Sequence, residues 1–307
     1  MEPEAAVLVV ILGPTAVGKS RVAVDLAMRF GGEIIGADSI QVYRGFDIGT
    51  DKPDAAARRG VPHHLIDCVD PEVQYTAADF VRDALAAAGD IAGRGRLPFV
   101  AGGTGLYLKA LLDGLFPGPG RDPAVRAALE VEAREHGLDR LFRRLAAIDP
   151  AYAAKIRDKD RVRIIRALEV HAATGRPISE HFPETRSPVA GRRVVCLGLA
   201  LDRTALVRRI DDRVERMFAR GLVDEVRGLL ARGVPEAAPP FRALGYRYVR
   251  RLLRGEISLP EAVSLTRIDT RRYAKRQMTW FRKMAGVTWF SPDDGPGLER
   301  HVQIRLQ

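Results

Sequence analysis

The sequence predicts an α/β protein, with a parallel sheet core flanked by helices and an all-helical lobe inserted into it. Two observations support this class. Apolar runs of strand length alternate with helical patterns in the first part of the chain, as is typical of strand–helix–strand units. A gap of about ninety residues with mainly helical patterns then separates the run at residues 97–101 from the next one at residues 193–201.

The first strand is expected at residues 6–12 and the first helix at residues 21–30, and the loop between them carries a motif. Its sequence, GPTAVGKS, matches the pattern G-x-x-x-x-G-K-[ST]. In this strand–loop–helix context, the glycines let backbone N–H groups close around phosphate oxygens at the positive end of the helix dipole. A P-loop-type core with a phosphate-rich ligand is therefore predicted at Gly13, Pro14, Thr15, Ala16, Val17, Gly18, Lys19 and Ser20. We expect Lys19 to reach the outer phosphate and the Ser20 hydroxyl to hold Mg²⁺.

Further strands are expected at residues 33–37, 64–66 and 97–101, with a helix at residues 75–91. The second strand ends at Asp38, which should lie beside the phosphate loop because parallel strands end at the same sheet edge. Its carboxylate could accept a proton from a nucleophile there, and a turn or helix N-cap is the alternative role.

The strand at residues 97–101 is followed by Gly102-Gly-Thr-Gly-Leu-Tyr107 and not by the acid that helps hold Mg²⁺ in NTPases, which weakens an ATPase interpretation. This second glycine-rich segment is either a tight turn or a place where a ligand approaches closely. Arg213 is either a solvated helix residue or a guanidinium suited to a leaving pyrophosphate.

The inserted helical lobe is predicted over residues 121–190, so that residues 1–120 and 191–307 form the core. Breakers at residues 117–120 and 183–191 mark its ends, and its helices are expected at residues 122–136, 138–148 and 160–174. After the late strand, the pattern predicts helices over residues 203–232, 245–253 and 259–284, and an edge strand at residues 288–290.

The formal net charge of +10 is concentrated near the C-terminus. Residues 242–283 hold twelve Lys and Arg residues against three acidic ones, interleaved with Tyr, Trp and Phe. Such a segment favours a phosphate backbone with exposed bases as partner, and a solvated helical face is the alternative. No apolar run approaches the roughly 18 residues that span a bilayer, and the acidic start lacks a signal-peptide pattern. We therefore expect a cytoplasmic protein with no membrane partner.

Short segments along almost the whole chain together carry a family resemblance. They are Gly13 to Ser20, DSIQVY from Asp38, DIGTDKP from Asp47, PHHLID from Pro62, GGTGLY from Gly102, RALEV from Arg166, GLVDEV from Gly221, ALGY from Ala243 and KRQMTW from Lys275. In this order the chain resembles the tRNA dimethylallyltransferases, also called tRNA isopentenyltransferases, of the compact bacterial type.

The resemblance implies transfer of a dimethylallyl group from dimethylallyl diphosphate to N6 of adenosine 37 in tRNA. It implies that Asp38 is the general base, and that Lys19, Ser20 and Arg213 neutralise the departing diphosphate together with Mg²⁺. The target base would be held by Asp38, Ser39, Ile40 and Gln41. The base must leave its stack to be alkylated, which suits a deep site with basic groups around it.

The resemblance also implies a set of tRNA contacts and a monomer without an obligatory protein partner. The contacts, beyond residues 38–41, are Thr104, Arg126, Val162, Arg163, Ile164, Ile165, Arg166, Arg242, Gly245, Tyr246, Lys275, Arg276, Gln277 and Trp280. Some family members have Gln where this chain has Val162, so a glutamine contact is lost or replaced there.

Two other enzyme classes remain as alternatives. One is an adenylate isopentenyltransferase that acts on free AMP, ADP or ATP, and the other is a P-loop small-molecule kinase. The basic C-terminal region and the helical insertion favour a polynucleotide acceptor over both.

Overall fold

The computed structural model describes residues 7–307, which fall into two compact units. One unit contains the chain up to Leu112 and again from Val189, and the other is Asp113–Pro188. The helical unit starts earlier than the lobe predicted from residue 121. The reason is that Phe116 packs against its core and Arg166 donates to the carbonyl oxygens of Pro119 and Gly120.

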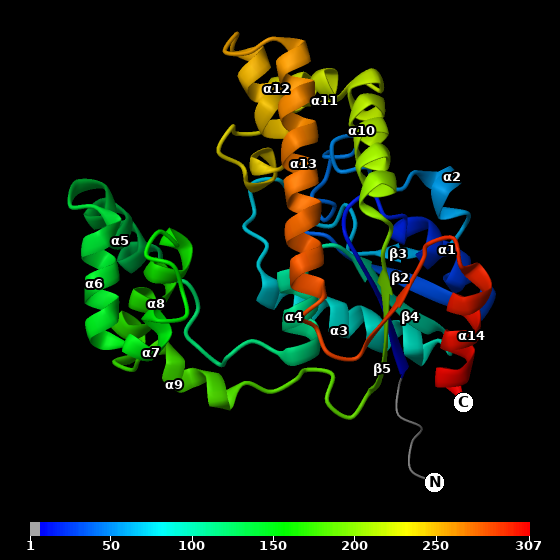
Figure 1. The fold of residues 1–307 in the computed structure, drawn as a ribbon, viewed down its shortest axis with the longest axis horizontal. Helices are drawn as coiled ribbons and strands as arrows, with labels where there is room; N and C mark the ends of the chain where they lie inside the picture. The colour runs from blue at the N-terminus through cyan, green and yellow to red at the C-terminus, as the bar shows by residue number, and fades with distance from the viewer. Residues whose placement is uncertain (1–6) are drawn as a thin grey trace. The chain divides into compact units, whose positions relative to one another are not determined.

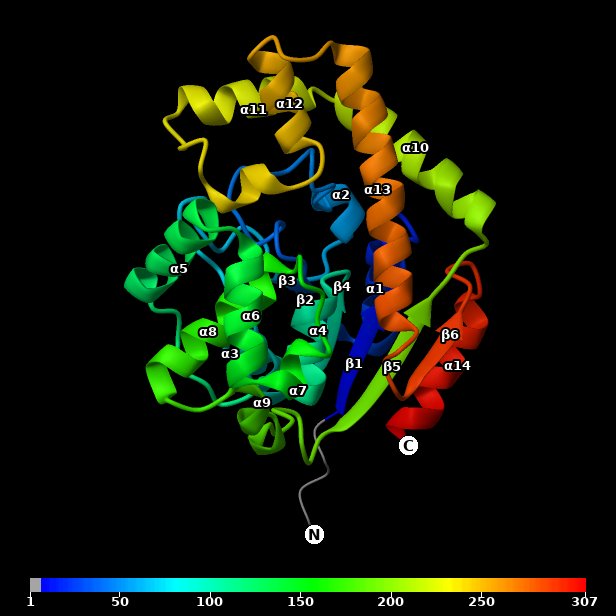
Figure 2. The same cartoon turned by 60° about the vertical axis from the view of Figure 1, so that its left-hand side comes forward.

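The sheet of the first unit has six strands, all parallel, in the order β3-β2-β4-β1-β5-β6. The strands are β1 (Val7–Leu12), β2 (Gly32–Ala37), β3 (His63–His64), β4 (Leu97–Gly102), β5 (Arg193–Leu199) and β6 (Val287–Phe290). The predicted α/β class and parallel sheet are confirmed. The expected edge strand at residues 288–290 is β6, which lies beside β5 in Figure 2.

Helices of this unit flank the sheet and extend from its carboxyl edge. They are α1 (Lys19–Phe30), α2 (Ala55–Arg58), α3 (Ala77–Gly93), α4 (Gly105–Asp113, which ends at the start of the other unit), α10 (Arg203–Ala219), α11 (Leu222–Ala231), the 3₁₀ turn Pro239–Arg242, α12 (Tyr246–Leu253), α13 (Leu259–Phe281) and α14 (Gly295–Leu306).

Strand β1 shows why both faces of the sheet are covered. Its side chains alternate between the two faces, as in any strand. Leu8 and Val10 belong to a core that includes Phe80 of α3, whereas Val9 and Ile11 belong to a second core with α1 and α14. Because both faces are buried, the strand is an unbroken apolar run, which is what made it recognisable in the sequence.

The C-terminal helices form a layer over the carboxyl edge of the sheet, where α10 and α13 run side by side (Figures 1 and 2). The helical pattern at residues 203–232 is broken by Gly221, whose φ of 93° ends one helix and begins α11. Helix α13 begins with a capping box, in which Ser258 and Glu261 satisfy each other's backbone N–H groups.

The helical unit contains α5 (Pro123–Glu135), α6 (Leu138–Ile148), α7 (Pro150–Ala153), α8 (Arg161–Thr174), α9 (Ile178–His181) and the 3₁₀ turn Phe182–Glu184. Its core is separate from those of the sheet and is built around Leu141, Ile164 and Leu168. Across residues 7–307, no helix combines the length and the apolar character needed to cross a membrane.

Candidate active site at the carboxyl edge of the sheet

The glycine-rich loop joins β1 directly to α1, as its pattern predicts. Gly13 and Gly18 have φ values of 154° and 105°, a region that favours glycine. A Cβ on Gly13 would lie 2.7 Å from the carbonyl oxygen of Leu199 at the end of β5, so a larger residue has no room there. Ala16 also has a positive φ, 63°, so the loop between β1 and α1 is tightly wound.

Lys19 and Ser20 occupy the first turn of α1. The Lys19 Nζ donates to the carbonyl oxygen of Pro14 at 2.8 Å, within the loop itself. Burial lowers the pKa of Lys19 to about 8; Asp38 opposes this shift and Arg213 adds to it. Ser20 is exposed at the helix start, where its hydroxyl is free to meet a ligand. The loop therefore carries the positive charge of Lys19 and of the helix N-terminus, and a bound anion would balance this charge.

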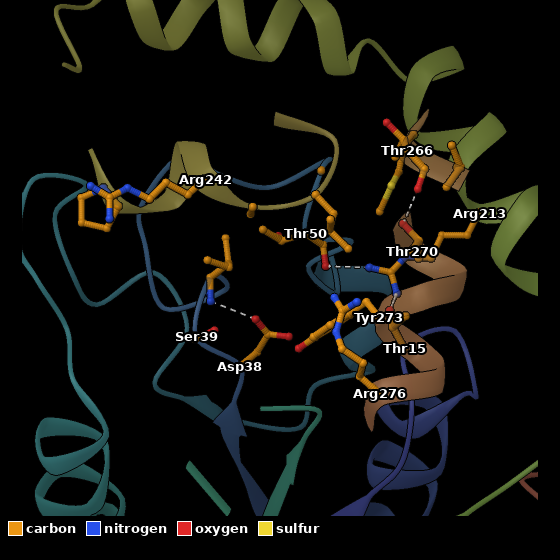
Figure 3. Close-up of a pocket in the computed structure, with 17 residues that line it drawn as sticks. Thr15, Asp38, Ser39, Thr50, Arg213, Arg242, Thr266, Thr270, Tyr273 and Arg276 are labelled. Atoms are coloured by element: carbon orange, nitrogen blue, oxygen red, sulfur yellow. Dashed lines mark hydrogen bonds between the residues drawn. The ribbon is translucent and has the colours of Figure 1, made fainter. Parts of the chain in front are cut away.

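Arg213 of α10 lies against the loop, and its guanidinium contacts three groups, of which those on Thr15 and Thr50 are drawn in Figure 3. One amino group donates to the Thr15 hydroxyl at 2.8 Å and the other to the Thr50 carbonyl at 3.1 Å. The Nε lies 3.3 Å from a carboxylate oxygen of Asp51. The interpretation of Arg213 as a solvated helix residue is therefore wrong, and its charge is fixed beside the phosphate loop.

Asp38 follows β2 and lines a cavity together with Thr15 and Arg213 (Figure 3). Its Oδ1 accepts backbone N–H groups from Ile40 at 2.9 Å and Gln41 at 3.3 Å. This is the turn that local sequence suggested, and it occupies one carboxylate oxygen. In the part of the chain that the structure describes, no hydrogen bond engages Oδ2. The turn and the proton-acceptor role are therefore compatible, because the turn fixes the carboxylate and leaves one oxygen for a substrate.

Side-chain hydrogen bonds connect the loops that follow neighbouring strands. The Gln277 amide of α13 accepts from the Thr15 N–H at 2.9 Å and donates to the Gly103 carbonyl at 2.7 Å. The Thr104 hydroxyl accepts from the Ser39 N–H at 3.0 Å. Gln277 is buried and both ends of its amide are engaged. Gln277 and Thr104, predicted as tRNA contacts, thus also hold the strand ends together.

A cavity of about 310 Å³ opens between these loops and the C-terminal helices. Its polar lining residues are Thr15, Asp38, Ser39, Thr50, Arg213, Arg242, Thr266, Thr270, Tyr273 and Arg276. Its apolar lining residues are Ile40, Val214, Met217, Pro239, Ala243 and Leu244. The cavity therefore offers basic groups, hydroxyl groups, one carboxylate and apolar side chains to a single ligand.

Helix α13 supplies cavity residues that the sequence analysis missed. Thr266, Thr270 and Tyr273 lie on one face at i, i+4 and i+7, followed by Arg276. Burial, reinforced by the Asp38 charge, raises the pKa of Tyr273 to about 12, so its hydroxyl stays protonated. The i, i+4, i+7 spacing of hydroxyl groups was the signal in the sequence that could have identified this face.

The predicted tRNA contacts of the sheet unit divide by exposure. Arg242, Lys275, Arg276 and Trp280 are exposed. Tyr246 is fully buried, and Gly245 is the buried N-cap of α12, so their positions do not suit a direct contact with RNA.

The basic stretch of residues 242–283 is largely neutralised by neighbouring acids. Ion pairs engage seven of its twelve cations: Arg247, Arg250, Arg251, Arg254, Arg267, Arg271 and Arg272. Within residues 7–307 the remaining five have no ion pair: Arg242, Lys275, Arg276, Arg282 and Lys283. The charge available to a polyanion is thus concentrated in a smaller set than the sequence suggested.

In the helical unit, two predicted contact residues share a buried acid. Glu169 is fully buried, and its carboxylate lies 3.5 Å from an amino group of Arg126 and 3.0 Å from one of Arg166. Of the stretch 162–166, Ile164 and Ile165 lie in the core of this unit. Their side chains therefore face no solvent, and this part of the prediction does not fit the structure.

The two residues of that stretch that precede the core positions face outward. Val162 is 67% exposed, and Arg163 is exposed with its Nε 3.5 Å from Asp160. Of residues 162–166, Val162 and Arg163 are therefore the ones with exposed side chains.

Comparisons with known proteins point to one family. The family model for IPP transferase matches residues 41–284, and the isopentenyl transferase model matches residues 6–67. The tRNA dimethylallyltransferase of Geobacter metallireducens is 51% identical over 94% of this chain and 93% of its own length. That of Thermomicrobium roseum is 49% identical over 98% of this chain and 90% of its own.

Solved structures with the same fold include tRNA isopentenylpyrophosphate transferase from Bacillus halodurans, with a TM-score of 0.71 and 42% identity over 97% of this chain and 95% of that one. A eukaryotic dimethylallyltransferase acting on tRNA has a TM-score of 0.82 and 29% identity over 98% of this chain and 78% of that one. The sheet-edge cavity, the phosphate loop and the near full-length similarity lead to one conclusion: the chain belongs to the IPP transferase family of tRNA dimethylallyltransferases.

Proposed function

We propose that this chain transfers the dimethylallyl group of dimethylallyl diphosphate to N6 of adenosine 37 in tRNA and releases diphosphate. One observation carries the proposal: a single cavity brings Thr15 of the phosphate loop, Arg213 and the Asp38 carboxylate together. The first two suit a diphosphate leaving group, and the third suits a proton donor such as an exocyclic amine.

The reaction breaks the bond between C1 of the donor and the diphosphate oxygen, and the electron pair leaves with the diphosphate. A bond forms between C1 and N6 of the adenine, and N6 gives up one proton. Oδ2 of Asp38 accepts that proton, since Oδ1 already accepts two backbone N–H groups. Allylic diphosphates ionise readily once the leaving charge is stabilised, so electrostatic contacts to the diphosphate should contribute most.

Arg213 is suited to this task because its planar guanidinium cannot lose its charge. Lys19 adds a second cation, whose proton a bound diphosphate would stabilise. The exposed Ser20 hydroxyl at the start of α1 fits Mg²⁺, which proteins commonly hold through few side chains and the phosphates of the substrate. Bound there, Mg²⁺ would supply positive charge to the leaving diphosphate.

A tRNA acceptor is favoured over a free nucleotide by the cations without an ion pair. Arg242 and Arg276 line the cavity, and Lys275 is exposed beside Arg276 on α13. Cations that continue beyond a cavity suit a substrate whose phosphates continue beyond the reacting base. Apolar lining residues such as Met217 and Leu244 are suited to the prenyl tail or to the face of the extruded base.

The direct test is mass spectrometry of nucleosides from unmodified tRNA incubated with the protein, dimethylallyl diphosphate and Mg²⁺. We expect adenosine that carries one dimethylallyl group in place of a proton, located at position 37 by sequencing of the digested tRNA. Parallel reactions with AMP, and with ATP in a phosphate-release assay, address the two other enzyme classes. Prenylated AMP without prenylated tRNA, or phosphate release without prenylation, would contradict the proposal.

Asp38→Asn tests the base. It keeps the size of the side chain and the oxygen for the turn, but it removes the proton acceptor. We expect turnover to fall by about a hundredfold or more, in the range of general base catalysis, with tRNA affinity within about twofold. Near-normal turnover of Asp38→Asn would remove Asp38 as the base.

A further inference from the structure

The loop of residues 47–52 determines where the Arg213 guanidinium points. Two of the three groups that hold the guanidinium belong to this loop: the Thr50 carbonyl at 3.1 Å and the Asp51 carboxylate at 3.3 Å. The Thr50 carbonyl also accepts from the Gln41 amide at 3.0 Å. A displacement of the loop would therefore move the acceptors of Arg213 and of one residue predicted to hold the target base.

Glu225 of α11 binds this loop through its backbone. Its carboxylate accepts three successive N–H groups, from Asp47 at 3.1 Å, Ile48 at 2.6 Å and Gly49 at 3.4 Å. Successive N–H groups that converge in this way form a concave anion site. Here the chain fills that site with its own carboxylate, from a helix about 175 residues further along.

Tyr246 completes the anchor. Its hydroxyl donates to Glu225 at 2.6 Å and accepts from the Gly49 N–H at 3.1 Å. Its ring lies so close to Gly49 that a Cβ there would be 2.5 Å from the ring carbon Cε2. Burial and the adjacent Glu225 charge raise the pKa of Tyr246, so the hydroxyl remains a donor. The ring, the hydroxyl and the carboxylate thus fix the start of the loop together.

The other end of the loop is fixed independently. The buried Lys52 donates from Nζ to the Tyr43 carbonyl at 2.6 Å, to Asp47 at 2.8 Å and to Asp67. These partners all belong to residues 43–67, so Lys52 fixes the internal shape of this segment. Glu225 and Tyr246 instead connect the loop to the helical layer that includes α10, and α10 carries Arg213.

We propose that Glu225 and Tyr246 are positioning residues that align Arg213 with the leaving diphosphate by anchoring the loop 47–52 to the layer of helices from which Arg213 projects. The proposal rests on the proposed role of Arg213 in diphosphate departure. It also assigns Tyr246 a role inside the protein in place of the tRNA contact that the family resemblance implied.

The test is a double-mutant cycle between Glu225→Gln and Arg213→Ala, with kcat, KM for dimethylallyl diphosphate and tRNA affinity measured for each protein. Glutamine keeps the size of Glu225 but has a single acceptor oxygen. Its amide N–H groups would face the N–H groups of the loop and cannot accept hydrogen bonds from them. Misplacing a group that stabilises the leaving charge should lower kcat by about tenfold or more, with tRNA affinity unchanged.

The matched control is Asp224→Asn, the neighbouring carboxylate on α11, which is 75% exposed and paired with Arg227. It removes the same charge from the same helix without touching the loop, so kcat should stay within about twofold of the unsubstituted protein. An equal loss in Asp224→Asn would mean that Glu225 acts through the charge of α11, and this would overturn the proposal.

The cycle separates positioning of Arg213 from general support of the fold. If Glu225 acts through Arg213, Glu225→Gln should change kcat by less than about twofold in the Arg213→Ala background, because the group that it aligns is already absent. A full loss in both backgrounds would overturn the proposal. If Arg213→Ala itself leaves kcat unchanged, the role of Arg213 fails; if only Glu225→Gln leaves it unchanged, only the further inference fails.

Tyr246→Phe provides an independent arm that stands even if Glu225→Gln does not fold. It retains the ring against Gly49 and removes only the hydroxyl. We expect a smaller decrease in kcat than in Glu225→Gln, about threefold to tenfold, which disappears in the Arg213→Ala background. If the main effect of Tyr246→Phe is on tRNA affinity, Tyr246 is an RNA contact after all and the proposal is wrong.

Discussion

Two parts of α13 carry basic residues whose charges are balanced differently. Along the middle of the helix, Arg267 pairs with Glu215 and Arg271 pairs with Asp211, and both acids belong to α10. Near the end of the helix, Lys275 and Arg276 have no ion pair among the described residues, and Arg276 lines the cavity. Acids of α10 therefore balance the charges of Arg267 and Arg271, whereas no acid of the described residues balances those of Lys275 and Arg276.

This difference shows that the density of basic residues is a poor measure of an RNA surface. An arginine paired with a carboxylate adds little to the field that a phosphate experiences, because the two charges largely cancel. An exposed, unpaired lysine or arginine contributes its full charge and releases counterions when a phosphate replaces them. The site of tRNA binding should therefore follow the unpaired cations.

The largest effect on tRNA binding is expected from removing Lys275 and Arg276, the two unpaired cations of α13, together. Lys275→Ala/Arg276→Ala should weaken tRNA binding by about thirtyfold, since each lost phosphate contact contributes on the order of 1 kcal/mol. The matched control is Arg267→Ala/Arg271→Ala, which removes two paired cations of the same helix and should weaken binding by less than about threefold. Equal losses in filter binding or fluorescence titration would break the comparison.

Lys19 is a cation inside the site, and its charge is expected to depend on pH. The pKa of Lys19, lowered to about 8 in the ligand-free site, means that its charged form prevails below pH 8 and declines above it. A bound diphosphate favours the charged form, so KM for dimethylallyl diphosphate should rise about tenfold between pH 7 and pH 9. Lys19→Arg cannot lose its charge, and its KM should be flat over this range. If KM rises with pH equally in the unsubstituted protein and in Lys19→Arg, a group other than Lys19 titrates, and the prediction is wrong.

Salt dependence sharpens the comparison further. Removing Lys275 and Arg276 should reduce the slope of log affinity against log salt by about 1.4, or roughly sevenfold in affinity between 50 and 200 mM salt. The double variant of Arg267 and Arg271 should keep the slope of the unsubstituted protein. An unchanged slope in Lys275→Ala/Arg276→Ala would mean that these side chains do not contact phosphates.

The smallest effect concerns folding. The ion pair of Arg271 and Asp211 has side chains 42% and 27% exposed, and such pairs contribute between about 0 and 1 kcal/mol. Arg271→Gln should lower the free energy of unfolding within that range in urea titration, whereas Lys275→Gln should leave it unchanged. A loss above about 2 kcal/mol would assign Arg271 a structural role larger than the ion pair explains.

The sheet and its phosphate loop could be predicted because their signals are local. Buried parallel strands are continuous apolar runs, and the motif from Gly13 to Ser20 requires the strand and helix on either side. Helix α14 escaped prediction because it begins Gly295-Pro-Gly297, which indicates a turn, and only Leu298 and Val302 of its residues are buried. Its place on the sheet comes from tertiary packing, which overrides the local signal.

The site was only partly predictable for the same reason. Asp38 and Arg213 were found from a strand end and from a family resemblance. The loop of residues 47–52 shows no helical or strand periodicity in its sequence. Its shape depends on contacts made by Glu225, Tyr246 and Lys52. The pairing of the arginines on α13 depends on which face α10 presents to them. Contacts between distant segments decide both features, and no local pattern encodes them.

The strand order sets the backbone distance between the two ends of the candidate active site. Asp38 follows β2 and the phosphate loop follows β1, with β4 alone between them in the sheet. Two strand intervals separate the proposed proton acceptor from the proposed diphosphate site by about 10 Å at the level of the backbone. The reacting carbon and the nitrogen that attacks it would have to meet within this separation. Because backbone pairing sets the separation, a side-chain substitution can alter the chemistry at either end while the separation itself stays the same.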